Sequence, residues 1–238
     1  MPDTREHRGP HPADAELFAP ALLPRLREAV ADFSLLLTKG YAEKSALKLV
    51  GDRFSLTQRQ RLAVMRSSCS DQQRDSRLAR CVPGEALAGQ PIAVDGYNLL
   101  ITIEAALSGG LIFQGRDRSF RDLASIHGTY RKVEETVPAV RLIGEFLRES
   151  RVASALWLLD SPVSNSGRLK TLIGQLAHES NWPWEIRLTI SPDAELSKMD
   201  TIVVTTDSII LDACPRWANL AAEITTRLLR SATIVDLA

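Results

Sequence analysis

Acidic residues follow apolar, strand-like runs at several points of the chain. The clearest case is Asp95, which directly follows the run Ile-Ala-Val at 92–94. The acids that follow such runs, directly or within a few residues, are Asp95, Asp160, Asp193 and Asp207. Because the carboxyl ends of parallel strands meet at one edge of a sheet, we expect these acids to lie close together. Carboxylate oxygens suit hard divalent cations, so the pattern predicts an Mg²⁺ or Mn²⁺ site held by all of them.

Asn98 lies three residues after Asp95, about one helical turn farther along the chain. We expect its amide to face the same edge and to orient a metal-bound water or a phosphate oxygen. The candidate catalytic residues for phosphodiester hydrolysis are therefore Asp95, Asn98, Asp160 and Asp207, with a bound metal lowering the pKa of the attacking water. Two structural roles compete. Asp95 is a candidate N-cap for the following helix, and Asn98 is a candidate hydrogen-bonding group at the start of that helix.

A hydroxyl-rich loop follows Asp160 and leads into a predicted helix. The free N–H groups at a helix N-terminus favour a phosphate group. The substrate contacts expected in this loop are Ser161, Ser164, Ser166 and Arg168. Capping of the helix by one of the serines, and a solvent-exposed role for Arg168, are the structural alternatives.

Residues 109–130 follow neither a helical nor a strand period and are rich in charged groups. A long polar stretch without regular structure inside a domain is often functional. Cations neutralise the backbone of a nucleic acid, and aromatic rings stack on its bases. The residues of this stretch that we expect to contact substrate are Arg116, Arg118, Arg121, His127 and Tyr130.

The sequence lacks the motifs of several other phosphate and ester chemistries. It contains no G-x-x-x-x-G-K-[ST], no G-x-G-x-x-G after the first predicted strand, and no G-x-S-x-G. A P-loop NTPase, a dinucleotide-binding enzyme and an α/β-hydrolase are therefore disfavoured.

The second half of the chain alternates strand-like runs with helical segments. The expected strands are 92–94, 153–159, 184–190, 202–205 and 233–235. The expected helices are 98–107, 137–150, 167–180 and 218–230. Such alternation predicts an α/β fold in which a parallel sheet is covered by helices on both faces, giving three layers.

The first half of the chain is predicted to be helical. Apolar residues recur with helical spacing over 22–37, a second helix covers 41–50, and Thr57 with Gln60 begins a third. Three short helices resemble a helix-turn-helix, which can bind DNA, although a simple packing module fits the pattern as well. The expected divisions are a disordered tail over 1–18, a small helical domain over 19–70, a linker over 71–90 and the α/β domain over 91–238.

Composition limits the partners of the chain. Lys plus Arg and Asp plus Glu number 29 each, so the formal net charge is zero and binding of a nucleic acid needs a local basic patch. No apolar run approaches the roughly 20 residues that span a bilayer. The three cysteines are odd in number and lack metal-ligand spacing, so we expect them to be reduced thiols. We expect a cytoplasmic protein without a membrane partner, and the sequence leaves the oligomeric state open.

The segment GYAEKSALKLVGDR at 40–53 resembles the opening domain of an uncharacterised prokaryotic family, domain-of-unknown-function family 434. The later segments VDGYNLLITIEAALSGG, RDLASIHGTYR, LLDSPVSNSGRL and VVTTDSIILD are similar to the later part of the same family. The resemblance covers most of residues 22–215. It implies a fold and carries no established activity.

The order of the acids is also similar to that of PIN-like nucleases, including the NYN branch. Those domains place an acid and an Asn after the first strand, as in Asp95 and Asn98, and an acid after a central strand, as in Asp160. They place further acids around the last core strand, as in Asp193 and Asp207. The resemblance implies a PIN-like, Rossmann-like domain that cuts RNA with Mg²⁺ or Mn²⁺. The long 109–130 segment departs from minimal PIN domains.

Two other functions fit the same pattern of residues. One is a non-catalytic protein that binds a nucleic acid or a nucleotide, and the other is a hydrolase of a small phosphorylated molecule. Cleavage of a polymer would indicate a nuclease, and binding without cleavage would indicate a binding protein. Absence of both would indicate a hydrolase of a small phosphorylated molecule.

Overall fold

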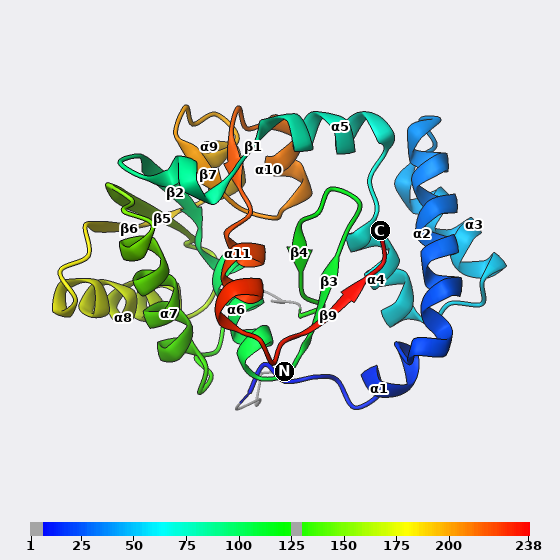
Figure 1. The fold of residues 1–238 in the computed structure, drawn as a ribbon, viewed down its shortest axis with the longest axis horizontal. Helices are drawn as coiled ribbons and strands as arrows, with labels where there is room; N and C mark the ends of the chain where they lie inside the picture. Colours follow the sequence, from blue (N-terminus) through cyan, green and yellow to red (C-terminus); the bar gives the residue numbers. More distant parts are fainter. Residues whose placement is uncertain (1–6, 125–129) are drawn as a thin grey trace.

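The computed structural model describes residues 7–124 and 130–238 and shows an α/β protein built on a parallel sheet (Figure 1). The six strands of this main sheet lie in the order β1-β8-β7-β2-β5-β6, and every pair is parallel. Their bounds are β1 Cys81–Val82, β2 Pro91–Asp95, β5 Ser154–Asp160, β6 Trp184–Thr189, β7 Ile202–Val204 and β8 Trp217–Ala218. The predicted parallel α/β sheet is confirmed.

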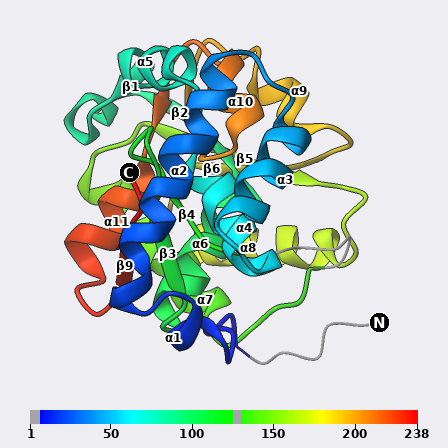
Figure 2. The same cartoon turned by 90° about the vertical axis from the view of Figure 1, so that its right-hand side faces the viewer.

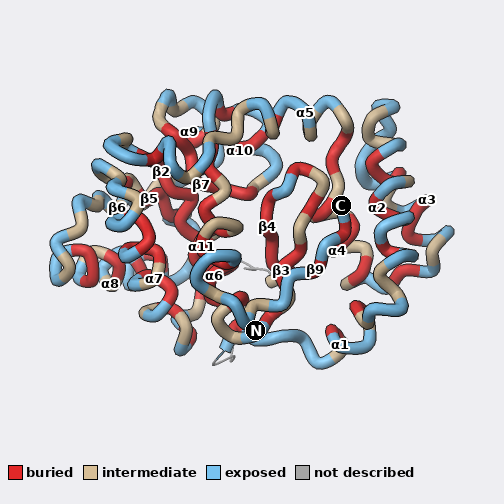
Figure 3. Tube along the Cα trace, in the orientation of Figure 1, coloured by how far each residue is buried: buried red, intermediate tan, exposed pale blue. Residues whose placement is uncertain are grey.

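Helices cover both faces of the main sheet because its strands are apolar on both sides. Val94 and Trp157 belong to the core under one set of helices, whereas their neighbours Ala93 and Leu158 belong to a core on the opposite face. The first set is α6 Gly96–Leu107, α7 Thr136–Glu149, α8 Ser166–Glu179 and α11 Leu220–Leu228. The opposite face packs against α9 Pro192–Leu196 and α10 Ser208–Ala213. Central strands are accordingly buried along their length (Figure 3).

A second, three-stranded sheet lies between the main sheet and the N-terminal helices (Figure 1). It consists of β3 Leu111–Gln114, β4 Phe120–Arg121 and β9 Thr233–Asp236. The expectation that 233–235 joins the main sheet is wrong, because β9 pairs in parallel with β3 instead. The 109–130 segment, expected to be irregular, supplies β3 and β4 to this sheet.

The N-terminal helices pack on the second sheet and share its core (Figure 2). They are α1 Asp14–Leu17, a 3-10 turn at Pro20–Leu22, α2 Leu23–Thr38, α3 Glu43–Arg53 and α4 Gln58–Ser67. The predicted capping box of Thr57 and Gln60 at the start of α4 is confirmed. Phe113 of β3 and Val235 of β9 are buried in the same cluster as the helices. The helical region therefore shares one core with the sheet beside it.

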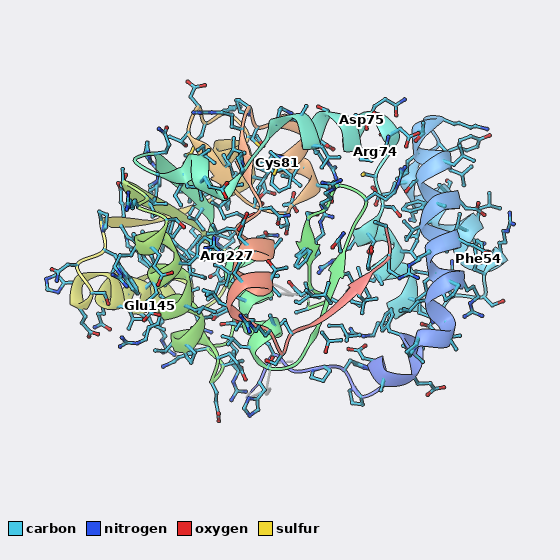
Figure 4. The ribbon with its side chains drawn as sticks, viewed as in Figure 1. Phe54, Arg74, Asp75, Cys81, Glu145 and Arg227 are labelled. Carbon is cyan, nitrogen blue, oxygen red and sulfur yellow. The ribbon has the colours of Figure 1, made fainter. Side chains whose placement is uncertain are left out.

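Residues 71–90, expected to form a linker, contain α5 Asp71–Arg80, β1 and a 3-10 turn at Gly84–Leu87. Arg74 and Asp75 pair with each other on the outer surface of α5 (Figure 4). Trp217 donates its indole N–H to the carbonyl of Arg77 at 2.7 Å. Since β1 also pairs with β8, this segment is part of the main sheet layer.

The described part of the expected N-terminal tail is also attached to the fold. Arg8 is 4% exposed, and its Nε lies 2.9 Å from a carboxylate oxygen of Glu104. Glu104 is itself fully buried on α6 and accepts further hydrogen bonds from Tyr130 and Thr136. No helix among the residues that the structure describes is long and apolar enough to cross a membrane.

Candidate functional site

The carboxyl ends of four neighbouring strands carry acids, as the sequence indicates. The strands lie in the order β7-β2-β5-β6. The residues at or just after their ends are Asp207, Asp95, Asp160 and Asp193, in that order across the sheet. We call this group the acid edge. Asp95 has the central place because β2 pairs with both β5 and β7.

The chain turns directly from β2 into α6 at Gly96. A Cβ atom there would lie 2.9 Å from the carbonyl oxygen of Leu158 and 2.5 Å from Cδ2 of Leu159. Cβ contacts this short require the neighbours to shift, and one of them is backbone of the adjacent strand. Glycine therefore lets α6 begin close against β5, which places Asn98 one turn from Asp95.

Asp95 and Asn98 both bind the segment that follows β7. Thr205 donates its hydroxyl to a carboxylate oxygen of Asp95 at 2.7 Å. Thr206 donates its backbone N–H and its hydroxyl to the amide oxygen of Asn98, at 2.8 and 2.9 Å. Asp95 occupies the N-cap position of α6 without a side-chain cap hydrogen bond, and the amide oxygen of Asn98 accepts from another segment. The two side chains instead fix the loop that carries Asp207.

Asp207 is half-buried and caps α10, where its carboxylate accepts hydrogen bonds from the backbone N–H groups of Ile209 and Ile210, at 2.8 and 3.4 Å. Asp160 is half-buried and Asp193 is exposed. No Lys, Arg or His within residues 7–124 and 130–238 forms an ion pair with any member of the acid edge.

Burial and neighbouring acids raise the pKa values of three members of the edge. Burial raises the pKa of Asp95 to about 7, the hydrogen bond from Thr205 opposes the shift, and the charges of Asp207 and Asp193 add to it. Burial and the charge of Asp193 raise the pKa of Asp160, and burial and the charge of Asp207 raise that of Asp193. Each acid of the edge is therefore within electrostatic reach of another, and the described residues supply no ion pair to offset their charge.

The donor atoms fit a hard divalent cation, because carboxylate oxygens are its preferred ligands. In the described parts of the chain, no three His, Cys, Asp or Glu side chains are arranged to hold one ion together. The edge thus has the charge and the donor type for a cation, although the side chains as they stand do not form a closed ligand shell.

The arginines expected to contact substrate have structural partners. Arg116 donates to the carbonyl of Cys69 and to Asp71. Arg121 is buried and donates to the carbonyl of Thr206 at 2.7 Å, so it binds the loop that carries Asp207 from the interior of the protein. Arg118 is exposed, has a φ of +62°, and lines a separate hollow with Trp217. None of these guanidinium groups forms an ion pair with the acid edge.

Tyr130 is 1% exposed, and its hydroxyl is held by Glu104 and Thr136. This burial leaves no surface for stacking on a substrate base. His127 lies outside the described residues.

The hydroxyl-rich loop after Asp160 is divided between surface and interior. Ser161 and Ser164 are exposed, whereas Ser166 is buried and donates to the carbonyl of Ser161 at 3.2 Å. None of the serines caps α8, which begins after Asn165 without a side-chain cap. Arg168 is exposed at this helix start.

Two features of the site were missed from the sequence. The hydroxyl of Tyr97 is buried and has no hydrogen-bond partner among the described residues. Its position between Asp95 and Asn98 was the available signal. Thr205 and Thr206 bind the loop that carries Asp207 to Asp95 and Asn98, and their place directly before Asp207 was the corresponding signal.

The fold and the acid edge define a class, namely a parallel α/β protein with carboxylates at adjacent strand ends. A family model described as "Domain of unknown function (DUF5616)" matches residues 84–223, more than half of the chain, and the chain belongs to this family. A second model, "Protein of unknown function (DUF434)", matches residues 25–80. The expected membership in family 434 is confirmed for the helical region, whereas the motifs from 84 onward fall in the other family.

The chain is similar to an uncharacterised protein, MJ0935, of Methanocaldococcus jannaschii. The two are 28% identical over 186 residues, which are 78% of this chain and 88% of that protein. The match includes most of both chains. No solved structure matches the chain.

Proposed function

We propose that this protein is a metal-dependent nuclease with a PIN-like α/β domain, acting on RNA. The observation that carries the proposal is the acid edge itself, where four carboxylates stand at adjacent strand ends without a cationic partner in the described residues. Burying a carboxylate such as Asp95 costs free energy unless it is paired. A site that accepts this cost and supplies no cation of its own suits a cation from solution.

The proposed PIN-like identity rests on the order of the acids along the chain and across the sheet. Asp95 ends the central strand, Asp160 and Asp207 follow the strands on either side of it, and Asp193 follows β6. The departures are the short strands β1 and β8, which extend the main sheet, and the second sheet.

In this proposal Asp95, Asp160, Asp193 and Asp207 hold Mg²⁺ or Mn²⁺. The metal, when bound, polarises the scissile phosphate and lowers the pKa of water. Asp95 supplies the central ligand, and its bond from Thr205 fixes its orientation. Asn98 holds the Asp207 loop through Thr206, which fixes this loop against the start of α6.

The test is a panel of labelled RNAs and DNAs incubated with Mn²⁺ and with the wild-type protein, Asp207→Asn or Asp200→Asn. Asn caps helices as well as Asp, so Asp207→Asn keeps α10 intact while removing a ligand charge. Asp200 is exposed and precedes β7, at the other end of that strand, which makes Asp200→Asn the matched control.

We expect RNA cleavage by the wild type and by Asp200→Asn, and a loss of at least 100-fold in Asp207→Asn. Salt-sensitive binding of RNA without cleavage by any of the three proteins would favour a binding protein instead. Neither binding nor cleavage of a polymer would leave a small phosphorylated molecule as the substrate.

A further inference from the structure

A cavity of about 590 Å³ lies beside the acid edge, between the N-terminal helices and the α/β domain. Asn98, Thr206 and Asp207 line one side of it. Phe33 and Leu37 of α2 and Met65 of α4 line another. The cavity therefore continues directly from the acid edge into a space walled by a different region of the chain.

Both sides of the cavity carry polar groups. The helical region contributes apolar side chains, of which Leu37 and Met65 are partly exposed, and the charged side chains of Glu43, Arg66 and Arg77, whereas the edge contributes an amide, a hydroxyl and a carboxylate. Ligand pockets for small organic molecules have volumes of roughly 300–1,000 Å³ and combine apolar walls with a few placed polar groups. The volume and lining suit a flat, partly polar ring system attached to a sugar.

Tyr97 also lines the cavity, and its buried hydroxyl has no partner among the described residues. A buried polar group without a hydrogen bond is uncommon because its desolvation is uncompensated. Burial and the charge of Asp160 raise the pKa of this hydroxyl, so it remains a neutral donor. Tyr97 therefore belongs to the wall of the cavity, whereas its hydroxyl is enclosed and not open to it.

We infer that this cavity binds the base and ribose of one nucleotide, and that Leu37 and Met65 of the N-terminal helices contact the base. The inference rests on the proposed function, because the acid edge would receive the phosphate attached to that ribose. It gives the helical region a role in recognising substrate at the site, in place of binding DNA through a helix-turn-helix. Because Leu37 of the helical region and Asp207 of the acid edge line the same cavity, we favour a ligand that contacts both regions over a ligand that contacts only one of them.

The test fills the cavity from the helical side. Leu37→Trp places a larger ring in the space, and Leu35→Trp is the matched control because Leu35 lies on the same helix, is 51% exposed and does not line the cavity. Met65→Trp fills the cavity from α4 and serves if Leu37→Trp fails to fold. Calorimetry with AMP and with ribose 5-phosphate, each with Mn²⁺ and with EDTA, measures binding that depends on the base.

We expect the wild type and Leu35→Trp to bind AMP at least tenfold more tightly than ribose 5-phosphate. We expect Leu37→Trp to bind AMP at least tenfold more weakly than wild type, with unchanged Mn²⁺ affinity. Equal affinity of the wild type for AMP and ribose 5-phosphate, or an equal effect of Leu35→Trp, would overturn the inference.

The Mn²⁺ titration keeps the two proposals distinguishable. Binding of AMP in EDTA by a protein that binds no Mn²⁺ would support the nucleotide cavity and contradict the nuclease. Binding of Mn²⁺ without any base-dependent binding of AMP would do the reverse.

Discussion

Two groups of acids in this protein have contrasting surroundings, the acid edge and a cluster around Asp117. Asp117 is 1% exposed and pairs with Arg77 at 2.7 Å and with Arg121 at 2.8 Å. Burial acts to raise its pKa, but the two guanidinium groups outweigh burial and hold that pKa well below its usual range. At Asp95 no cation opposes burial, and the pKa rises to about 7.

The difference separates an acid that stabilises the fold from an acid kept for a ligand. The Asp117 cluster joins α5, the 115–121 segment and the loop after β7, because Arg77 also donates to Asp212 and Arg121 donates to Thr206. Its charges are neutralised from within the chain. The acid edge has no ion pair of this kind among the described residues, and our central claim is that a cation from solution neutralises it.

The largest expected effect is at the neutralised cluster. Asp117→Asn would leave Arg121 buried without its counter-charge and Arg77 with Asp212 alone, and breaking a buried pair in this way costs about 3–5 kcal/mol. Urea unfolding followed by circular dichroism at pH 7 measures the loss. A loss below about 1 kcal/mol would mean that Asp117 is not the counter-charge of the cluster.

At the acid edge we expect that removing a carboxylate stabilises the folded protein instead of destabilising it. The folded pKa of Asp95 is raised from 3.8 to about 7, so the folded state binds the proton more tightly and loses stability as the pH rises from about 4 to about 7. Asp95→Asn removes this penalty and should stabilise the metal-free protein at pH 8 by about 2–4 kcal/mol, with little effect at pH 4. Unfolding in urea with EDTA at both pH values checks this. Destabilisation at pH 8 would contradict the uncompensated state of the edge.

A smaller effect is expected at Tyr97. Its hydroxyl is buried without a partner in the described structure, so Tyr97→Phe removes an uncompensated polar group and should stabilise the protein by about 1 kcal/mol. The comparison is Tyr130→Phe, which removes a hydroxyl bonded to Glu104 and Thr136 and should destabilise it by about 1–2 kcal/mol. Thermal melts of the two variants measure the contrast. Equal losses in both would show that Tyr97 has a partner of its own.

The sequence predicted the parts of the site that depend on local pattern. An apolar run followed by an acid places the acid at a strand end, and this reasoning located Asp95, Asp160 and Asp207 at one edge of the main sheet. The helices that follow β2 and β5 were predicted to within two residues at each end. The spacing of apolar residues predicts these elements because core-facing side chains recur at a regular interval in a strand and at a different one in a helix.

The parts that were not predicted depend on contacts distant in sequence. Arg77 and Asp117 are 40 residues apart, and nothing in either segment indicates that they pair. Arg121 was expected at the substrate, yet it supports Thr206 from inside the fold. The strands β1 and β8 have two residues each, too few for a period, and the run at β9 does not indicate which sheet it joins.

The most direct test of the central claim is a calorimetric titration with Mn²⁺ at pH 8 of the wild type, Asp95→Asn and Asp200→Asn. We predict saturable binding by the wild type and by Asp200→Asn, and binding at least tenfold weaker by Asp95→Asn. Because Asp95→Asn is expected to be the more stable protein without metal, weaker binding by it cannot come from unfolding. Absence of Mn²⁺ binding by the wild type, or equal affinity in all three proteins, would contradict the account.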